Sequence, residues 1–402
     1  LDLEEALASL KAQLLPITEV EQCALQHCRG RVLAKPVTAQ LSLPPFRGSA
    51  MDGYAIQAGK HDQLQTVIGE SLAGNPFQGD IGPRECVRIF TGALVPANAG
   101  QIILQEEVAE REGNQVRFNA HTPSESYIRP VGHDLKEGSQ IANKGDVLNP
   151  FLMGSLASAG VSLVKVFRKP VIGVFSSGDE LRDPGVDVND LLAGQIYDSN
   201  RLTVMQLLAT MPVEVRDLGR LADAADVVSE ALTNGAQVCD AMITSGGVSV
   251  GDADYISETI EKLGTLAFWR LNLKPGKPMA FGKIENCWIF GLPGNPVSTI
   301  VTALLLVRPA LATLAGTVPE PPLRIKAKLT TSLQHQPGRT EYQRGTFTQH
   351  AGEFKVGHTG DQGSNRLSTF HNANCLIEVD KAQDDLLSGD WVNILPLSDL
   401  TK

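Results

Sequence analysis

The sequence predicts a multi-domain protein of the α/β plus β class, whose central α/β domain has a mostly parallel sheet. The chain has 402 residues, which is too long for one ordinary domain. Residues 171–316 alternate apolar strands with helices at short spacing, a pattern typical of βαβ units. The stretches on either side are short strands between Gly, Pro and Asn turns, which indicates separate β domains.

The elements before the α/β part suggest two further domains. Leucines at helical spacing predict an amphipathic helix over residues 1–15, namely Leu3, Leu7, Leu10 and Leu14. We assign residues 1–48 and 143–170 to a linker domain and expect its N-terminal helix to pack on the α/β domain. PFLMGSLASAG predicts a short helix near 151–160. Residues 49–142 form the inserted β-rich domain.

The remaining chain divides at a proline-rich joint. VIGVFSS, VEVRDLG and DAMITSGG read as strands of the α/β domain, residues 171–320. Helices are predicted for NRLTVMQLLATM, ADAADVVSEALTN and YISETIEKLG. After GTVPEPPLR, residues 321–402 are short strands again, which predicts a C-terminal β-barrel-like domain.

Charge and composition exclude several classes of partner. The formal net charge of -10 argues against nucleic acid and against an anionic membrane, because either needs a dominant basic face. The longest apolar run, residues 299–307, is too short to span a bilayer. Six dispersed cysteines without a CxxC pair indicate reduced thiols rather than disulfides or zinc. No signal peptide is evident, so we expect a cytoplasmic protein.

Three glycine-rich or acidic segments follow predicted strands of the α/β domain. They are FSSGDEL at 175–181, TSGGVSVGDADY at 244–255 and FGLPGNPVS at 290–298. Ligands of open parallel sheets bind outside the carboxyl ends of the strands, and bare turns offer backbone N–H groups to anions. A shared anion site is the functional interpretation, and three tight βα turns are the alternative.

The second segment also matches two short motifs. Gly246 to Gly251 fits half of a P-loop, but Asp252 stands where the phosphate-binding lysine is required, which excludes that motif. GVSVG fits a nucleophile elbow with Ser249 as nucleophile, although the strand is expected to end too early, near Ser245. A serine hydrolase therefore stays an alternative. The carboxylates of Asp252 and Asp254 suit Mg²⁺, and Glu180 and Asp179 are further candidate ligands. Capping of a helix N-terminus is the alternative interpretation of these acids.

The loop in WRLNLKPGKPMAFG, residues 269–282, is the best candidate for gripping an anion. Proline and glycine fix its course, so Lys274 and Lys277 present two ammonium groups, with Arg270 four residues before the first. A solvated surface loop is the alternative. Turns at PPFRGSAMDGYA, FTGALVP and GHDLKEG are each ordinary when taken alone.

Taken in order, these segments resemble the molybdopterin molybdenumtransferases, the bacterial MoeA proteins and the E domain of gephyrin. The resemblance covers essentially the whole chain and rests on SAMDGYA, TGALVP, SSGDEL, GQIYDSNR, TSGGVSVGDADY, KPGKPMAFG and GLPGNPVS, with GRTEYQRG and GDQGSNRLSTF near the end. It implies a central domain similar to the molybdopterin adenylyltransferase.

The resemblance implies a reaction as well as a fold. Adenylylated molybdopterin and molybdate are the implied substrates, Mg²⁺ the cofactor and AMP the released product. It also implies an elongated homodimer with a cross-subunit active site, and the adenylyltransferase and other cofactor-maturation proteins as possible partners. A molybdopterin-binding scaffold without turnover is the alternative.

The implied site residues fall into three groups. The implied catalytic residues are Asp52, Thr91, Asp134, Glu180, Asp254 and Lys274. The implied substrate-binding residues are Gly178, Asp179, Ser245, Gly246, Gly247, Ser249, Arg270, Lys277, Pro293, Pro296 and Ser364. The implied Mg²⁺ ligands are Glu180, Asp252 and Asp254. The sequence departs from the family at His133, where an acid is usual, and at Arg270, where lysine is frequent.

Overall fold

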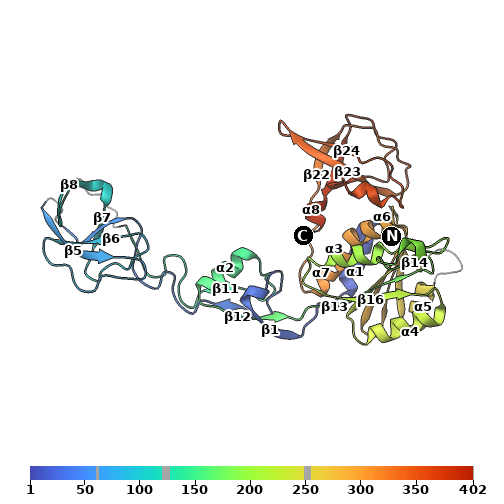
Figure 1. The fold of residues 1–402 in the computed structure, drawn as a ribbon, viewed down its shortest axis with the longest axis horizontal. Helices are drawn as coiled ribbons and strands as arrows, with labels where there is room; N and C mark the ends of the chain where they lie inside the picture. Colours follow the sequence, from blue (N-terminus) through green and yellow to red (C-terminus); the bar gives the residue numbers. More distant parts are fainter. Residues whose placement is uncertain (60–62, 120–126, 249–254, 402) are drawn as a thin grey trace. The chain divides into compact units, whose positions relative to one another are not determined.

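The computed structural model describes residues 1–59, 63–119, 127–248 and 255–401, and the chain forms two compact units. The first unit comprises residues 1–21, 30–34 and 166–402, and the second comprises residues 22–29 and 35–165. Strands β1 (Val20–Ala24) and β12 (Leu163–Phe167) carry the chain from one unit to the other (Figure 1). The residue boundaries of the four domains stay a prediction.

The second unit is built around a six-stranded sheet in the order β7-β4-β6-β5-β9-β8. Its strands are β4 (Gly53–Ile56), β5 (Gln65–Ser71), β6 (Glu85–Ile89), β7 (Gln101–Leu104), β8 (Val108–Glu112) and β9 (Gln115–Phe118). Alternate residues of β4 go to different clusters: Ala55 packs with Ile89 and Ile102, whereas Tyr54 packs with Ile103 and Phe118. The sheet is therefore covered by apolar side chains on both faces, as the pleat requires.

Shorter elements complete this unit. They are η1 (Leu25–His27), β2 (Val37–Thr38), β3 (Gly48–Ser49), η2 (Gln105–Glu107), β10 (Ile128–Arg129), β11 (Gln140–Ala142) and α2 (Pro150–Ser158). Strand β3 pairs with β10, and β2 with β11, both antiparallel. The short helix predicted near 151–160 is α2, where Pro150 occupies the first turn and the Asn149 side chain accepts a hydrogen bond from the Leu152 amide.

The first unit contains the predicted α/β sheet, with strand order β16-β13-β17-β21-β20-β18. The strands are β13 (Val171–Ser177), β16 (Glu214–Leu221), β17 (Ala241–Ser245), β18 (Thr265–Arg270), β20 (Pro278–Ile284) and β21 (Cys287–Leu292). The first four strands in that order run parallel, and β20 is antiparallel to both neighbours. This confirms a mostly parallel sheet, buried as such sheets are.

Helices cover both faces of this sheet (Figure 1). The helical elements are α1 (Leu3–Gln13), α3 (Asn200–Leu208), α4 (Ala225–Ala236), α5 (Tyr255–Leu263), α6 (Pro296–Thr302), η4 (Ala303–Val307) and α7 (Arg308–Leu314). One apolar cluster contains Leu10 of α1 with Val204 and Leu311, and another contains Val228 with Ile260. Helix α1 thus packs on the α/β part, through the leucines whose spacing predicted it.

The helices α6, η4 and α7 are continuous, so the apolar run at 299–307 is part of a longer helix. By length and composition alone, Pro296–Leu314 could cross a membrane. However, 83% of its most apolar window is buried within the structure, as in the core helix of a soluble protein. Burial inside the fold accounts for its apolar character.

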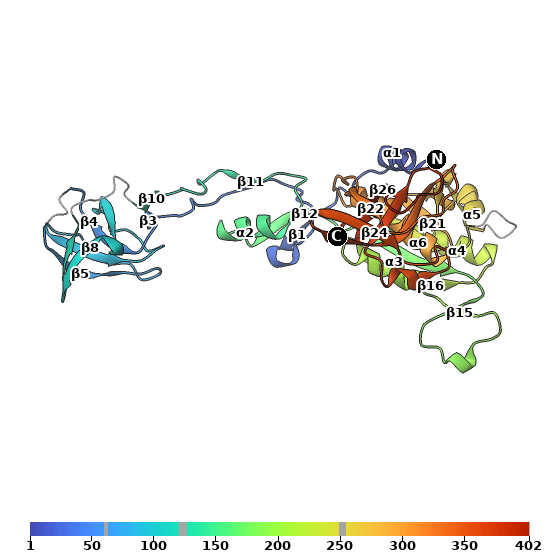
Figure 2. The same ribbon diagram turned by 90° about the horizontal axis from the view of Figure 1, so that it is seen from above.

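Between β13 and α3 the chain forms an arm that extends from the sheet (Figure 2). It contains β14 (Leu181–Arg182), η3 (Val188–Asp190) and β15 (Ile196–Tyr197), with β14 and β15 parallel. Val188 and Leu192 are each 68% exposed, and Ile196 is 56% exposed. The arm therefore presents apolar side chains to solvent.

The C-terminal strands close into a five-stranded barrel. The strands are β22 (Ile325–Leu329), β23 (Thr340–His350), β24 (Glu353–His358), β25 (Cys375–Val379) and β26 (Trp391–Pro396), followed by α8 (Leu397–Leu400). They pair in the order β23-β24-β22-β26-β25, and β25 pairs again with β23. This confirms the predicted C-terminal barrel. The two-residue strand β19 (Leu273–Lys274) adds to β23 and links the barrel to the α/β part.

Candidate functional site

The three glycine-rich segments begin side by side, because the strands that lead into them, β13, β17 and β21, are neighbours in the sheet; residues 249–254 of the second segment lie outside the described residues. Ser176 is in register with Ser245, and Ser245 with Leu292. The Gly246 amide donates to the Leu292 carbonyl at 3.1 Å. The chain therefore places these turns together at the carboxyl edge of the sheet, where ligands of open α/β folds bind.

Gly246 and Gly247 are required by local packing, whatever binds near them. Both have left-handed backbones, with φ of +92° and +71°. A Cβ on Gly246 would lie 2.3 Å from the carbonyl oxygen of Ser177, and one on Gly247 would lie 2.8 Å from Ile256 Cγ1. The bareness of this turn thus has a structural cause.

Two paired serines at this edge differ in their hydrogen bonding. Ser176 Oγ donates to Asp198 Oδ2 at 2.6 Å, and Asp198 also accepts from Arg201 Nε at 3.1 Å. Ser245 is only 3% exposed, yet its hydroxyl has no hydrogen-bond partner among the described residues. The neighbouring Thr244 hydroxyl is in the same situation. Such groups are uncommon in folded proteins and call for an explanation.

The predicted metal ligands are only partly visible. Ser249, Asp252 and Asp254 lie outside the described residues. Asp179 and Glu180 are exposed carboxylates in the turn after β13 and Gly178. No group of three or more His, Cys, Asp or Glu side chains that could hold a metal occurs among residues 1–59, 63–119, 127–248 and 255–401.

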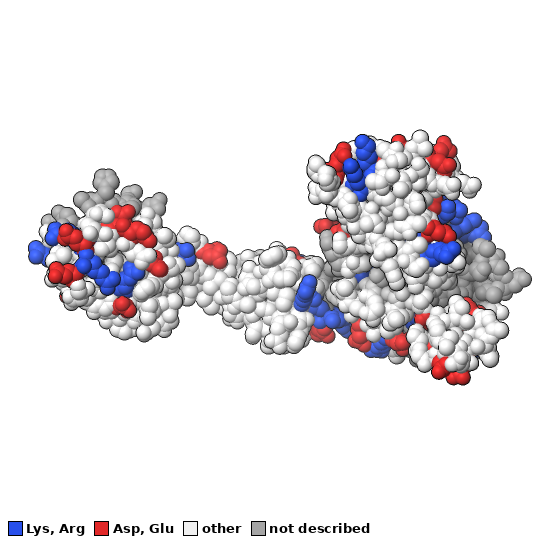
Figure 3. Space-filling model, turned by 45° about the horizontal axis from the view of Figure 1, so that its top comes forward, with Lys and Arg blue, Asp and Glu red and all other residues white. Residues whose placement is uncertain are grey.

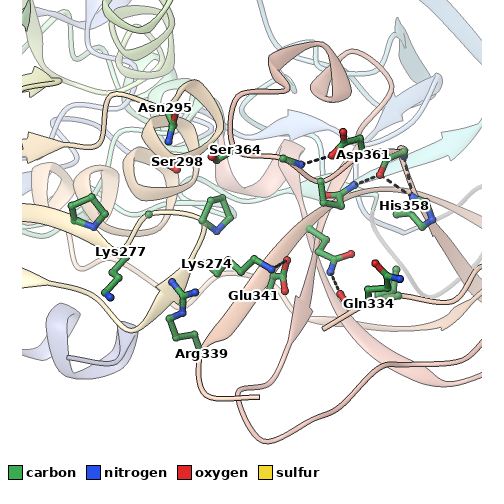
Figure 4. Close-up of a pocket in the computed structure, with 18 of the residues that line it drawn as sticks. Lys274, Lys277, Asn295, Ser298, Gln334, Arg339, Glu341, His358, Asp361 and Ser364 are labelled. Atoms are coloured by element: carbon green, nitrogen blue, oxygen red, sulfur yellow. Dashed lines mark hydrogen bonds and ion pairs between the residues drawn. The ribbon is translucent and has the colours of Figure 1, made fainter. Parts of the chain in front are cut away.

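The basic loop lines a cavity of about 850 Å³ between the α/β part and the barrel (Figure 4). Lys274, Lys277 and Arg339 supply its positive charge, and Asn295 and Ser298 at the start of α6 line another side. Gly276, with φ +121°, turns the loop. The predicted lysines Lys274 and Lys277 thus line the same cavity as an arginine of the barrel part, and these three cations suit the cavity to an anion.

Lys274 is tied to a buried acid. Its Nζ lies 3.1 Å from Glu341 Oε1, and the Glu341 side chain is only 4% exposed. The other oxygen, Oε2, lies 2.9 Å from His335 Nδ1. Strand β19 aligns Lys274 with Glu341 in register on β23, which explains why the two side chains meet.

Ser364 lies in a loop of the barrel that borders the same cavity. Its carbonyl accepts the amide of Val297 in the first turn of α6, at 3.0 Å. Arg344 holds this loop: its side chain is fully buried and donates to the carbonyls of Asp361, Gln362 and Gly363. Burial lowers the pKa of Arg344 to about 10.

The other residues predicted in this unit are placed nearby. Pro293 is buried in the turn after β21, and Pro296 is the first residue of α6; Asn295 and Ser298, not these prolines, line the cavity. Arg270 ends β18 opposite Pro278. It is exposed and does not line the cavity.

Asp52 and Thr91, predicted separately, meet in the second unit. Asp52 Oδ1 accepts the Thr91 amide at 2.7 Å and the Thr91 hydroxyl at 2.8 Å. The amide bond, followed by the hydroxyl bond, lowers the pKa of Asp52 below its usual value. Asp134 lies in another exposed turn, where its amide donates to the Leu43 carbonyl at 2.9 Å.

Several residues around the cavity were not predicted from the sequence. Arg339, Glu341 and Arg344 belong to GRTEYQRG, which carried the resemblance but received no role. A charged residue at every second or third position of a strand-like segment is the only local signal. The role of Glu341 comes from the pairing of β19 with β23, which joins residues 67 positions apart and leaves no trace in local sequence.

The charges of the surface agree with the composition. On the face shown in Figure 3, Lys and Arg side chains are interspersed with Asp and Glu. The positive charge of the cavity is therefore a local feature in a chain whose net charge is -10.

Comparison with known families covers nearly the whole chain. Residues 1–160 match the family described as the MoeA N-terminal region (domain I and II). Residues 173–313 match the probable molybdopterin binding domain, and residues 326–397 match the MoeA C-terminal region (domain IV).

Individual relatives agree with these matches. A molybdopterin molybdenumtransferase of Haemophilus influenzae is 39% identical over 404 residues, covering 100% of this chain and 99% of the relative. Gephyrin of Dictyostelium discoideum is 31% identical over 94% of this chain and 59% of its own length. The crystal structure of the molybdopterin biosynthesis moeA protein of Pyrococcus horikoshii OT3 has a TM-score of 0.80 at 28% identity, covering 98% and 99% of the two chains. The chain therefore belongs to the molybdopterin molybdenumtransferases, a family of enzymes.

Proposed function

We propose that this chain inserts molybdate into adenylylated molybdopterin in an Mg²⁺-dependent reaction that releases AMP. The single observation that carries the proposal beyond family membership is the cavity lined by Lys274, Lys277 and Arg339. The proposed substrates are a phosphoanhydride and a molybdate dianion, and both need positive charge around them. The carboxylates of Glu341 and Asp361 also line the cavity, so the three cations are in excess by one charge. In a chain of net charge -10, this local positive excess supports an anionic substrate.

The sheet edge supports a second part of the same proposal. A buried hydroxyl without a partner costs roughly 1–3 kcal/mol, which is recovered when a ligand supplies the partner. The Ser245 hydroxyl is buried and has no partner in the part of the chain that the structure describes, at the strand end where α/β proteins bind ligands. We place the pterin or a phosphate of the substrate there, beside Gly246 and Gly247 and the turn at Gly178 and Asp179. The Gly246 amide already donates to the Leu292 carbonyl and so is not counted as a donor to the ligand.

We propose that Glu180, Asp252 and Asp254 hold Mg²⁺. Carboxylate oxygens are the ligands that this ion prefers, and Glu180 is an exposed carboxylate at the same sheet edge. When bound, Mg²⁺ would neutralise the phosphate charge that develops as the anhydride breaks. Lys274 and Lys277 would bind the anionic groups from the cavity. Pro293 and Pro296 would shape the turn between β21 and α6 next to it.

We also propose a homodimer with a cross-subunit active site. Asp52 and Thr91 form an exposed, fixed carboxylate site in the second unit, which suits a role toward a substrate held by the other subunit. The exposed Val188, Leu192 and Ile196 of the arm support a protein partner, because such patches mark interaction sites. Asp134 and Arg270 stay assigned to this site through the family resemblance.

The setting of the reaction is also a proposal. All six cysteines are free thiols, which fits a reducing, cytoplasmic compartment. The molybdopterin adenylyltransferase and other cofactor-maturation proteins are the proposed partners, because one makes the substrate and others receive the product.

One assay tests the proposal. Purified protein is incubated with adenylylated molybdopterin, molybdate and Mg²⁺, and AMP is measured against a reaction lacking molybdate and one with Lys274→Ala. We expect molybdate-dependent AMP release that falls at least about tenfold in the variant, since removal of one preorganised charge typically costs this much or more. Binding of the substrate without AMP release would favour the scaffold. AMP release that Lys274→Ala leaves intact but Ser249→Ala abolishes would favour the hydrolase.

A further inference from the structure

We infer that Glu341 and His335, two buried residues of the barrel part, position Lys274 for the reaction and form a hydrogen-bonded chain behind it. That Lys274 takes part in a reaction rests on the proposed function, whereas the contacts among the three side chains do not. The chain runs from His335 Nδ1 to Glu341 Oε2 at 2.9 Å, and from Glu341 Oε1 to Lys274 Nζ at 3.1 Å.

The exposure of the side chains increases along this hydrogen-bonded chain. The side chains of His335, Glu341 and Lys274 are 1%, 4% and 46% exposed. Polar groups therefore lead outward from the interior to a single ammonium group at the cavity. An ammonium has three donors, so one bond to Glu341 leaves two for oxygens of a substrate.

The histidine has a defined hydrogen-bonding role. Its Nε2 is buried and has no partner among the described residues, which would leave an N–H at that atom unsatisfied. The ring that fits carries its hydrogen on Nδ1 and donates it to Glu341. The backbone amide of His335 in turn donates to Asp385 Oδ1 at 2.7 Å, which fixes the segment. Both oxygens of Glu341 are thus engaged, and its carboxylate is held in one orientation.

This arrangement distinguishes the two lysines of the loop. Lys277 also lines the cavity, but in Figure 4 its side chain points away from Glu341. Lys274 alone is in register with Glu341. A charge fixed by buried partners needs less reorganisation when the substrate charge develops, whereas a free lysine must first be ordered. Lys274 is therefore the cation with a preset position, and the barrel supplies that position.

The kinetic test compares two pairs of variants in the full-length protein. Glu341→Gln and His335→Leu remove a link of the chain, and His335→Asn keeps a donor close to the Nδ1 position. For Glu341→Gln and His335→Leu we expect kcat of AMP release to fall about ten- to hundredfold with KM changed less than about threefold, the scale of a misplaced catalytic group. His335→Asn should recover most of the loss. Glu353→Gln, which removes an exposed acid from the same barrel, serves as the matched control and should behave as wild type.

A second readout does not need turnover. Limited acylation with an N-hydroxysuccinimide ester, followed by mass spectrometry, gives the labelling ratio of Lys274 to Lys277. Loss of the carboxylate frees Lys274 from its ion pair, so the ratio should rise in Glu341→Gln and stay constant in Glu353→Gln. An unchanged ratio together with wild-type kinetics in both Glu341→Gln and His335→Leu would overturn the inference. A raised ratio in a protein whose wild type releases no AMP would support the positioning and reject the proposed reaction instead.

Discussion

Thr91 gives Asp52 two hydrogen bonds, from its amide at 2.7 Å and from its hydroxyl at 2.8 Å, both to the same carboxylate oxygen. The two residues are 39 positions apart in the chain. Asp52 directly precedes β4, Thr91 follows shortly after β6, and these two strands are paired in the sheet. Because both donors favour the ionised form, the pKa of Asp52 lies below its ordinary value. The second unit thus presents a carboxylate that is charged and oriented before any substrate arrives.

Thr91→Val separates the two donors, because it removes the hydroxyl and keeps the amide. We expect the pKa of Asp52 to rise only partly toward its ordinary value, since the amide is the larger cause. A pH titration of the side-chain carboxyl carbon by NMR measures this. The pKa of Asp361, lowered chiefly by the Gly363 amide, is the internal reference and should not change. A full return of the Asp52 pKa to its ordinary value would contradict the dominant role of the amide.

The sign of the pH effect on stability follows from the same shift. A carboxyl whose pKa is lowered by folding stabilises the folded state above its unfolded pKa, and this contribution is lost as pH falls through the folded value. The difference in Tm between the wild type and Thr91→Val should therefore be constant near neutral pH and shrink below pH 3.8, the ordinary value for aspartate. A difference that grows on acidification would show that another group is responsible.

Ser245→Ala and Ser176→Ala should differ in their effect on stability, although the two serines are paired in register. Ser176→Ala removes one of the donors to the buried Asp198, which keeps only those of Arg201 among the described residues, and should destabilise the fold by about 1–3 kcal/mol. Ser245→Ala removes a hydroxyl that has no partner among the described residues, so stability should change by less than about 0.5 kcal/mol or increase. Urea unfolding measures both. If Ser245→Ala also weakens substrate binding, the hydroxyl belongs to the site; equal destabilisation by both variants would refute the assignment.

Gly246→Ala should be among the most damaging single-methyl changes at the sheet edge. The methyl would meet the Ser177 carbonyl oxygen at 2.3 Å, in addition to the strain of φ +92°. Gly389→Ala is the matched control, with φ +101° and open space around the added Cβ. We expect Gly246→Ala to cost about 1–3 kcal/mol more than the control, the usual cost of overpacking. Equal losses in thermal unfolding would mean that the backbone conformation alone matters.

Arg344→Met tests the buried clamp beneath the loop that carries Ser364. The variant removes hydrogen bonds to three loop carbonyls and to Thr369 Oγ1, and leaves these part-buried acceptors without their charged donor. A loss of about 3 kcal/mol or more in unfolding free energy is expected, because hydrogen bonds from a charged group contribute about 1.5–3 kcal/mol each. Arg366→Met changes an exposed arginine of the same segment, paired with Asp361 at the surface, and should cost less than about 1 kcal/mol. Similar losses for both would place the stability of this loop elsewhere.

Mixed dimers test the cross-subunit proposal. Asp52→Ala and Lys274→Ala subunits, each inactive alone, are coexpressed with different tags and the heterodimer is purified. If each site takes Lys274 from one subunit and Asp52 from the other, one of two sites is intact, so about half of the wild-type rate should return. No recovery of AMP release in a folded heterodimer would count against a shared site.

Much of the fold follows from local sequence. The alternation of apolar strands with helices fixed the α/β part, and helical leucine spacing fixed α1. The apolar run at 299–307 was less informative, because continuous hydrophobicity does not reveal that α6, η4 and α7 form one buried helix. Closure of the barrel through the second pairing of β25 with β23 has no local sequence pattern either.

Local sequence was enough to identify the residue types that the chemistry needs: a rigid loop with Lys274 and Lys277, glycine turns at strand ends, and Asp52 before its glycine. Which of these residues act together became clear from the folded chain. Strand order brought the turns at Gly178, Gly246 and Pro293 to one edge, and the pairing of β19 with β23 gave Lys274, but not Lys277, a buried acid. The physical reason is that hydrogen-bond partners and burial depend on contacts between distant segments, which the local spacing of residues does not encode.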